Sequence, residues 1–321
     1  MDASPTTAPA PADVLGPAGA RAPLRCSDRD VTYADALDAL ALRGGWAPLV
    51  ADVAARSAGL VAADERTRSA VDTAVPGAEI ALRRRLRLTS ADDYRTWLES
   101  WDLDVDDCRE HLRLRALPPP DDAVTQAEVD AVAVRAHVVI EGVLDDAVRR
   151  LAEDAALAGA DPRSPSWLAD VVERADRVRA EEPDPLAVAD LVSEHVVDWT
   201  RVEATAVVAP DDDVAHELLL CVREEQAPLS DVAARVGLSP THVATFVEAL
   251  DDWLEPVVLG VEPGALAGPV AHPDGRAVVQ LIARTPPSAV DDDVRRRAAA
   301  ELLERRAAVA MSAVVRWSDG A

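Results

Sequence analysis

Some residues of this chain are of types that could bind a metal, and their spacing decides whether they do. The segment DDDVAHE at 211–217 brings Asp213, His216 and Glu217 within about one helical turn of each other. Acidic residues at the start of a helix more often cap it and face its dipole. A second DDDV, at 291–294, also opens a predicted helix and favours that interpretation. We therefore expect no metal and no other cofactor.

The cysteines and most histidines do not form a catalytic pattern. Cys221 lies in the apolar run LLLCV, where a thiol is usually buried and inert. Cys26 and Cys108 are not at metal-type spacing from it or from each other. The histidines have no partner at the spacing of a triad. His272 is retained as a candidate, because it lies in VAHPDG, a turn before a predicted strand.

Residues 229–250, LSDVAARVGLSPTHVATFVEAL, have the spacing of a helix-turn-helix. Ala233 would lie where two helices cross, Gly237 in the turn, and Val243 on the buried face of a second helix. The exposed face of that helix would carry no basic residue, and DNA readers need basic contacts to phosphates and bases. A helix-turn-helix regulator is therefore the disfavoured alternative. The acidic residues of that face are Glu248, Asp251 and Asp252.

The charge of the chain also argues against nucleic acid. The 321 residues carry a formal net charge of −25, and no lysine occurs among the 33 basic residues. A field of this sign repels phosphates and acidic membranes, so we expect no nucleic-acid partner and no membrane partner. The densest basic run, RRRLR at 83–87, is either a solvated helix face or a clamp for an acidic peptide segment.

The expected location follows from the termini and the cysteines. The first residues have no basic start and no apolar core segment, and no stretch reaches the length of a transmembrane helix. The three cysteines are an odd number. We expect a cytoplasmic protein with reduced thiols.

The periodicity of the apolar residues is mostly helical. Residues 1–27 are rich in proline and alanine and are expected to be a disordered tail. Helices should then follow, with Ser90 or Thr89 as one cap and Asp104 as another, and with a break or kink at Pro76. Alternating β-branched residues predict strands near 201–208 and 275–284.

The stretch LEPVVLGVEPGALAGPVAHPDGRAVVQLIAR, residues 254–284, resembles the closing segment of a parvulin-type (PpiC-like) peptidyl-prolyl isomerase domain. That segment comprises a helix, a Pro-Gly turn, a short strand, a small-residue turn and the last central strand. LTSADDYRTWLESWDLDVDDCREHL resembles the helical part of SurA-like chaperones. The resemblance implies a mainly α fold. Its parts would be a SurA-like bundle at 28–198, a small α+β parvulin-like domain at 199–287, and a C-terminal helix at 288–321 that packs back on the bundle.

The resemblance also implies where the isomerase residues would stand. The two histidines of the family fall at Ala206 and Ala277 in this chain, so both are lost. Rotation about an X–Pro bond breaks no covalent bond, and a site that fits the twisted amide can lower its barrier of about 18–20 kcal/mol. An active peptidyl-prolyl isomerase therefore stays open as an alternative, and it is the enzyme activity to expect if there is any.

The function that the resemblance favours is binding of extended or unfolded peptide by a chaperone-like protein with a degenerate isomerase domain. Such a protein could assist the maturation of a ribosomally made peptide. Arg276, His272 and Phe246 are expected to line a peptide cleft between the bundle and the sheet domain. Arg276 would hold a carboxylate of the peptide, or would pair with the chain's own Asp251 or Asp252.

Overall fold

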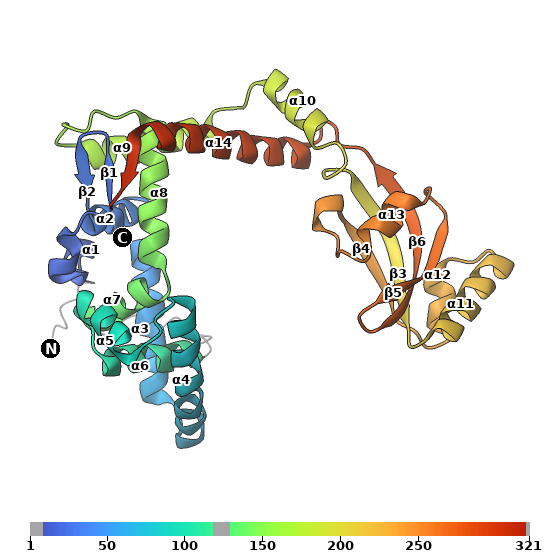
Figure 1. Cartoon of the computed structure of the whole chain (residues 1–321), viewed down its shortest axis with the longest axis horizontal. Helices are drawn as coiled ribbons and strands as arrows, with labels where there is room; N and C mark the ends of the chain where they lie inside the picture. Colours follow the sequence, from blue (N-terminus) through green and yellow to red (C-terminus); the bar gives the residue numbers. More distant parts are fainter. Residues whose placement is uncertain (1–8, 118–128, 319–321) are drawn as a thin grey trace, which may run out of the picture. The chain divides into compact units, whose positions relative to one another are not determined.

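The computed structural model describes residues 9–117 and 129–318, and these divide into two units (Figure 1). The helical unit contains the chain up to Glu181 and again from Arg305, and the sheet unit contains Glu182–Glu304. The first boundary lies before the 198/199 boundary expected from the sequence. The reason is that helix α10 (Pro185–Glu194) packs with Trp199 of the sheet unit.

The helical unit buries one large apolar core, in which Leu37, Leu98, Leu151 and Trp167 are almost fully covered. Every helix from α2 to α9 contributes buried side chains to this core, and a small three-stranded sheet has the order β2-β1-β7. Its elements are α1 (Pro11–Val14), η1 (Gly16–Ala20), β1 (Leu24–Cys26), β2 (Arg29–Val31), α2 (Tyr33–Leu42), α3 (Trp46–Ala62), α4 (Glu65–Arg85), α5 (Ala91–Ser100), α6 (Val105–Ala116), α7 (Ala131–Ile140), α8 (Val143–Ala158), α9 (Trp167–Ala180) and β7 (Val315–Trp317).

The expected disordered tail is wrong for residues 9–27, which are folded into this unit. Val14 and Leu15 are fully buried, and β1 pairs with both β2 and β7. Proline and alanine composition predicted disorder, but two apolar side chains and three strand residues find partners elsewhere in the chain. Residues 1–8 lie outside the described part.

Helix ends follow the sequence signals closely. Ser90 and Asp104 each accept a hydrogen bond from the backbone three residues on, in complete capping boxes. Asp291, the first residue of the second DDDV, caps α14 (Asp292–Val314) by accepting from the backbone N–H groups of Asp293 and Val294. Pro76 does not break the helix: it lies inside α4, which continues to Arg85 and buries Val71, Val75 and Leu82.

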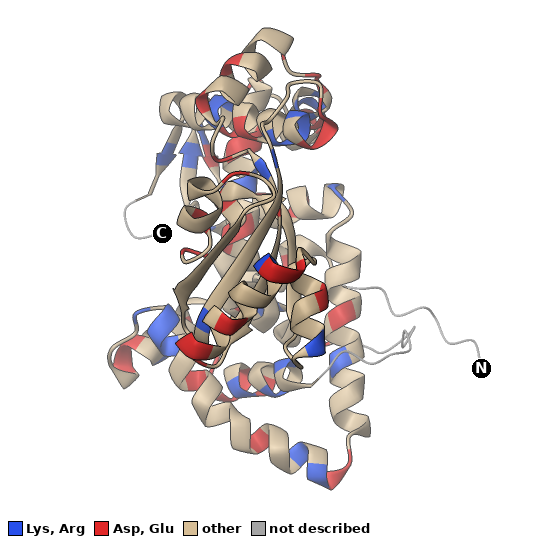
Figure 2. Cartoon of the chain, turned by 90° about the vertical axis from the view of Figure 1, so that its right-hand side faces the viewer, with Lys and Arg blue, Asp and Glu red and all other residues tan. Residues whose placement is uncertain are grey.

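The sheet unit contains the expected antiparallel sheet, with β3 and β6 adjacent at its centre and the order β4-β3-β6-β5 (Figure 1). Figure 2 shows that its long strands carry few charges, whereas acidic and basic residues are interspersed over the helices. Besides α10 and the first part of α14, its elements are β3 (Arg201–Ala209), α11 (Asp212–Glu225), α12 (Leu229–Arg235), β4 (Pro240–Phe246), η2 (Val247–Ala249), α13 (Glu255–Gly260), β5 (Leu266–His272) and β6 (Gly275–Thr285).

The two faces of this sheet have separate cores because strand side chains alternate between them. Val207, Ala209 and Val278 pack under α11 and α12. Ala206 and Val279, each one residue along, pack on the opposite face with α13. We call these the α11 face and the α13 face.

The expected second helix of a helix-turn-helix is wrong. Gly237 has a φ of +79° and ends the turn after α12, but strand β4 follows and pairs with β3. Pro240 disfavours helical backbone at the residue before it. Thr241, Val243 and Thr245 then alternate as a strand requires, so pairing with β3 prevails over the local helical pattern.

Candidate functional site on the α13 face of the sheet

The two alanines at the expected histidine positions lie near each other on one face of the sheet. Ala206 of β3 is opposite Val279 of β6, and Val208 is opposite Ala277. This register puts all four side chains on the α13 face. Ala206 is 4% exposed and Ala277 is fully buried. The centre of this face is therefore made of methyl and isopropyl groups, without an ionisable side chain at either alanine.

The apolar surface around these alanines is only partly covered. Val208 and Val270, which flank Ala277 on the neighbouring strands, are half-buried. At the hairpin between β5 and β6, His272 lies edge-to-face against Trp253, with ring centroids 4.9 Å apart. The α13 cover thus leaves a partly exposed apolar surface near the end of the sheet, bordered by two rings.

His272 presents a defined tautomer at this border. Its Nδ1 accepts a hydrogen bond from the backbone N–H of Asp274 at 3.0 Å. In a neutral imidazole one nitrogen accepts and the other carries the proton, so Nε2 is the donor. The side chain is 16% exposed. His272 can therefore donate one hydrogen bond to a carbonyl oxygen of a molecule lying on the α13 face.

Close backbone approach shapes the hairpin that carries His272. Gly275 has a φ of +147°, and a Cβ there would lie 2.2 Å from the carbonyl oxygen of Ala209. Gly268 has a φ of +123°, and a Cβ there would lie 2.7 Å from the carbonyl oxygen of Ala277. Only glycine fits both places, so these residues set the strand spacing beside Ala277.

Arg276 lies on the other face of the sheet. It neighbours Ala277 in sequence, so its side chain points to the α11 face. There its Nε is 3.2 Å from the carboxylate of Asp212 in the first turn of α11. An intramolecular partner was one of the two expectations, but that partner is Asp212 and not Asp251 or Asp252. The pair is about half exposed.

Phe246 lies at the far end of the sheet from His272. It is opposite Arg201, whereas Arg276 is opposite Ala209, eight residues along β3 and roughly 26 Å away. Phe246 packs with α10 and the first turns of α14, and the guanidinium of Arg297 lies 4.1 Å from its ring centre. The structure therefore does not bring Arg276, His272 and Phe246 together into one site.

The residues that suggested metal or thiol chemistry have structural roles. Asp211 caps α11 by accepting from the N–H of Val214, and His216 contacts the backbone oxygen of Asp212 at 2.9 Å. Cys221 is half-buried beside the core of the α11 face. Within the described ranges, no group of three or more histidine, cysteine or acidic residues is arranged to hold a metal.

The sequence did not indicate the ring pair of His272 and Trp253. Helix α13 and most of β5 lie between the two residues in the chain, and only the folding of α13 onto the sheet brings the rings together. The expectation for His272 rested on its place beside a turn, and the structure has it at the end of β5, directly before the turn to β6. The sequence carried no signal for its tautomer. Among the helices that the structure describes, none is long and apolar enough to cross a membrane.

No protein-family model matches the chain, and no curated protein matches it. Solved structures do. A peptidyl-prolyl isomerase (PrsA) from Bacillus cereus is 12% identical, with 90% of this chain and 86% of that chain covered and a TM-score of 0.29. PrsA from Bacillus anthracis is also 12% identical, with 53% and 86% covered and a TM-score of 0.27.

A third structure comes from a study of two SurA-like chaperones of Campylobacter jejuni. It is 9% identical, with 93% of this chain and 99% of that chain covered and a TM-score of 0.21. The first two structures are thus peptidyl-prolyl isomerases, and the third is a SurA-like chaperone.

Proposed function

We propose that this chain is a peptide-binding, chaperone-like protein whose sheet unit binds extended peptide on the α13 face without efficient prolyl isomerisation. One observation carries the proposal. Ala206 and Ala277, at the positions of the family's histidines, lie on the same face, bordered by half-buried apolar side chains and by one hydrogen-bond donor.

The surface suits binding for two reasons. Burying the half-exposed parts of Val208, Val270 and Trp253 gains about 25 cal/mol per Å² of apolar area. The Nε2–H of His272 adds a directional contact to a peptide carbonyl. Neither kind of contact depends strongly on the sequence of the client, because apolar surface accepts many side chains and every peptide has backbone carbonyls. Binding of unfolded chains requires this tolerance.

The same surface is poor for isomerisation. The methyl groups of Ala206 and Ala277 neither donate nor accept a hydrogen bond, so neither can stabilise the twisted amide. The barrier of about 18–20 kcal/mol is then lowered only by shape. We propose binding as the principal function and weak or absent isomerase activity.

Titration of the intact chain with a labelled, unfolded client tests this function. Replacing His272 by Phe keeps a ring against Trp253 and removes the donor, so the dissociation constant should rise about three- to tenfold, as expected for one hydrogen bond. His242→Phe is the matched control, because His242 is exposed on edge strand β4. Equal binding by the parent and His272→Phe would remove the α13 face from the site.

The client and its compartment are further parts of the proposal. An extended-peptide binder suits a ribosomally made precursor peptide, and capture of such a peptide by the intact chain would test it. Cys26, Cys108 and Cys221 are free thiols. Free thiols persist in reducing compartments, so we propose that the protein works in the cytoplasm. Fractionation of cells that express the chain would test this location.

A further inference from the structure

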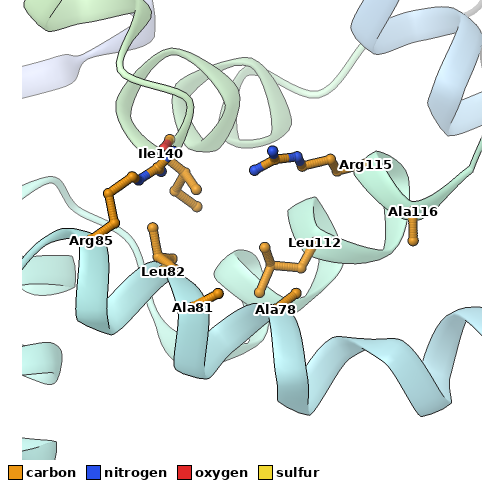
Figure 3. A pocket seen from close by; sticks show the side chains of 8 residues that line it. All are labelled: Ala78, Ala81, Leu82, Arg85, Leu112, Arg115, Ala116 and Ile140. Carbon is orange, nitrogen blue, oxygen red and sulfur yellow. Dashed lines mark hydrogen bonds between the residues drawn. The ribbon is translucent and has the colours of Figure 1, made fainter. Parts of the chain in front are cut away.

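The helical unit contains a pocket that the sequence did not indicate (Figure 3). Its volume is about 440 Å³, within the range of about 300–1,000 Å³ typical of ligand sites. Leu82 of α4, Leu112 of α6 and Ile140 at the end of α7 form its apolar wall. Arg85 and Arg115 border it, and Figure 3 shows the guanidinium of Arg115 reaching from α6 toward the side where Arg85 and Ile140 lie.

Contacts within the chain hold the two arginine side chains in place but do not use all of their hydrogen-bond donors. Arg85 donates to the backbone oxygen of Ile140, which is a neutral acceptor. Arg115 contacts the carboxylate of Glu141 at 3.2 Å, and His111 shares the same oxygen at 2.9 Å. A guanidinium has five N–H donors, so both side chains keep donors for another acceptor. The Arg115 side chain is 56% exposed.

The charge around the pocket is unusual for this chain. The net charge is −25, and most arginines lie within ion-pair distance of a carboxylate. Within the described ranges, no ion pair involves Arg83, Arg84, Arg85 or Arg87 of the basic run; Arg83 instead lies 5.5 Å from the ring centre of Tyr94. This end of α4 is therefore a local positive site on an acidic protein.

Arginines in the last turn of a helix also interact favourably with the helix dipole, which would explain the run without any ligand. Arg115 lies in the last turn of α6 and has the same favourable interaction with the dipole of that helix. The dipoles do not require the two helix ends to place arginines beside one apolar pocket, which Arg85 and Arg115 both border. Two guanidinium groups from two helices, beside an aliphatic wall, are complementary to a ligand in which a carboxylate stands next to an aliphatic side chain.

We propose that this pocket binds an acidic peptide, with an aliphatic side chain against Leu82, Leu112 and Ile140 and an adjacent carboxylate held by Arg85 and Arg115. The proposal rests on the proposed peptide-binding function and names a client class for it. The carboxylate is either that of an Asp or Glu side chain or the free C-terminus, because both present the same two oxygens. The site belongs to the helical unit and is separate from the α13 face.

Fluorescence anisotropy of the intact chain with a labelled peptide of alternating Leu and Glu tests the pocket. Arg115→Gln should raise the dissociation constant about tenfold, as loss of a charge-assisted hydrogen bond does. Ala81→Leu should do the same by filling the pocket, since Ala81 is exposed on its wall. Arg177→Gln on α9 is the control with the same change of charge, and it should bind like the parent.

Peptide variants separate the two carboxylate sources. An amidated peptide that binds like the free acid assigns the contact to a side chain, and one that binds about tenfold more weakly assigns it to the C-terminus. The pocket is refuted if an amidated Leu-Gln peptide, which has neither kind of carboxylate, binds as tightly as the Leu-Glu peptide. It is also refuted if Arg115→Gln and Arg177→Gln bind alike. Binding of a non-acidic unfolded client that His272→Phe weakens would leave the proposed function intact in either case.

Discussion

At the scale of single residues, Asp154 is a fully buried charge at the centre of an ion-pair network in the helical unit. It is completely buried on α8, in ion pairs with Arg43 at the C-cap of α2 and Arg179 of α9, and Arg150 lies 3.5 Å away. An aspartate with these partners links three helices by charge. Removing it would leave guanidinium groups without their central counter-charge in a poorly hydrated place.

We predict that Asp154→Ala lowers the free energy of unfolding by about 3–5 kcal/mol, the usual cost of breaking a buried pair. Urea denaturation measures it. The control is Asp146→Ala on the same helix, whose side chain is 78% exposed and lies 3.6 Å from Arg149. That change should cost under about 1 kcal/mol. Similar losses in the two variants would show that the network around Asp154 contributes little.

A second prediction concerns acid. Burial and the neighbouring His111 lower the pKa of His137, so the folded state holds its ring neutral. The unfolded chain then binds more protons below the ordinary histidine pKa of 6.5, and stability falls as pH falls through that range. The hydrogen bond from His111 lowers the pKa of Glu141, whose contribution is lost at still lower pH.

Stability measured between neutral and mildly acidic pH should therefore decline in the parent. His137→Gln should decline less, because the proton uptake of the unfolded chain at this position is gone. His216→Gln, at an exposed site on α11, should keep the slope of the parent. A parent slope that His137→Gln leaves unchanged would contradict the assignment to His137.

Residue types alone indicated which side chains are candidates for a site, but not which residues these side chains contact. Arg276 was expected to hold a peptide carboxylate or to pair with Asp251 or Asp252, and in the structure it pairs with neither of these two residues. Its actual partner, Asp212, follows from the register of β6 against β3, which places it on the α11 face. A register is set by pairing between distant strands, and a shift of one residue would turn Arg276 to the face of His272.

At the scale of elements, local signals predicted helix starts well and one strand badly. Ser90, Asp104 and Asp291 cap their helices as expected, because a cap depends on residues within one turn. Strand β4 was expected to be a helix. The alternation of side chains along β4 is weak evidence for a strand by itself, and only pairing with β3 establishes the extended conformation.

The β5–β6 hairpin is the element that shapes the candidate site, and its glycines test that role. Gly275→Ala should lower the free energy of unfolding by about 1–3 kcal/mol, because φ is +147° and the new Cβ would meet the backbone of Ala209. It should also weaken client binding. Gly59→Ala is the control: Gly59 is inside α3 with open space around it, and the change should stabilise by about 0.5–1 kcal/mol.

Thermal unfolding of the two variants provides the comparison. Opposite signs for Gly275→Ala and Gly59→Ala are expected. A Gly275→Ala protein as stable as the parent, and with unchanged client binding, would show that the hairpin backbone does not require glycine at this place.

At the scale of the whole molecule, the sequence indicated a mainly α protein with a small α+β part, and this is correct. Apolar periodicity carries that information directly. It does not carry the pairing of β1 with β7, in which Leu24 is opposite Trp317. Nor does it show that the helical unit contains both the first described residues and the last ones. Such contacts join distant parts of the chain, and no local pattern encodes them.

The central claim is that the chain binds extended peptide without accelerating prolyl isomerisation. Exchange NMR of a labelled proline-containing peptide tests both parts at once in the presence of the intact chain. We predict that the peptide resonances shift or broaden on binding, while cis and trans forms interconvert over tens of seconds or longer, as they do without a catalyst. Cis–trans exchange within a second, or resonances that the protein leaves unchanged, would contradict the account.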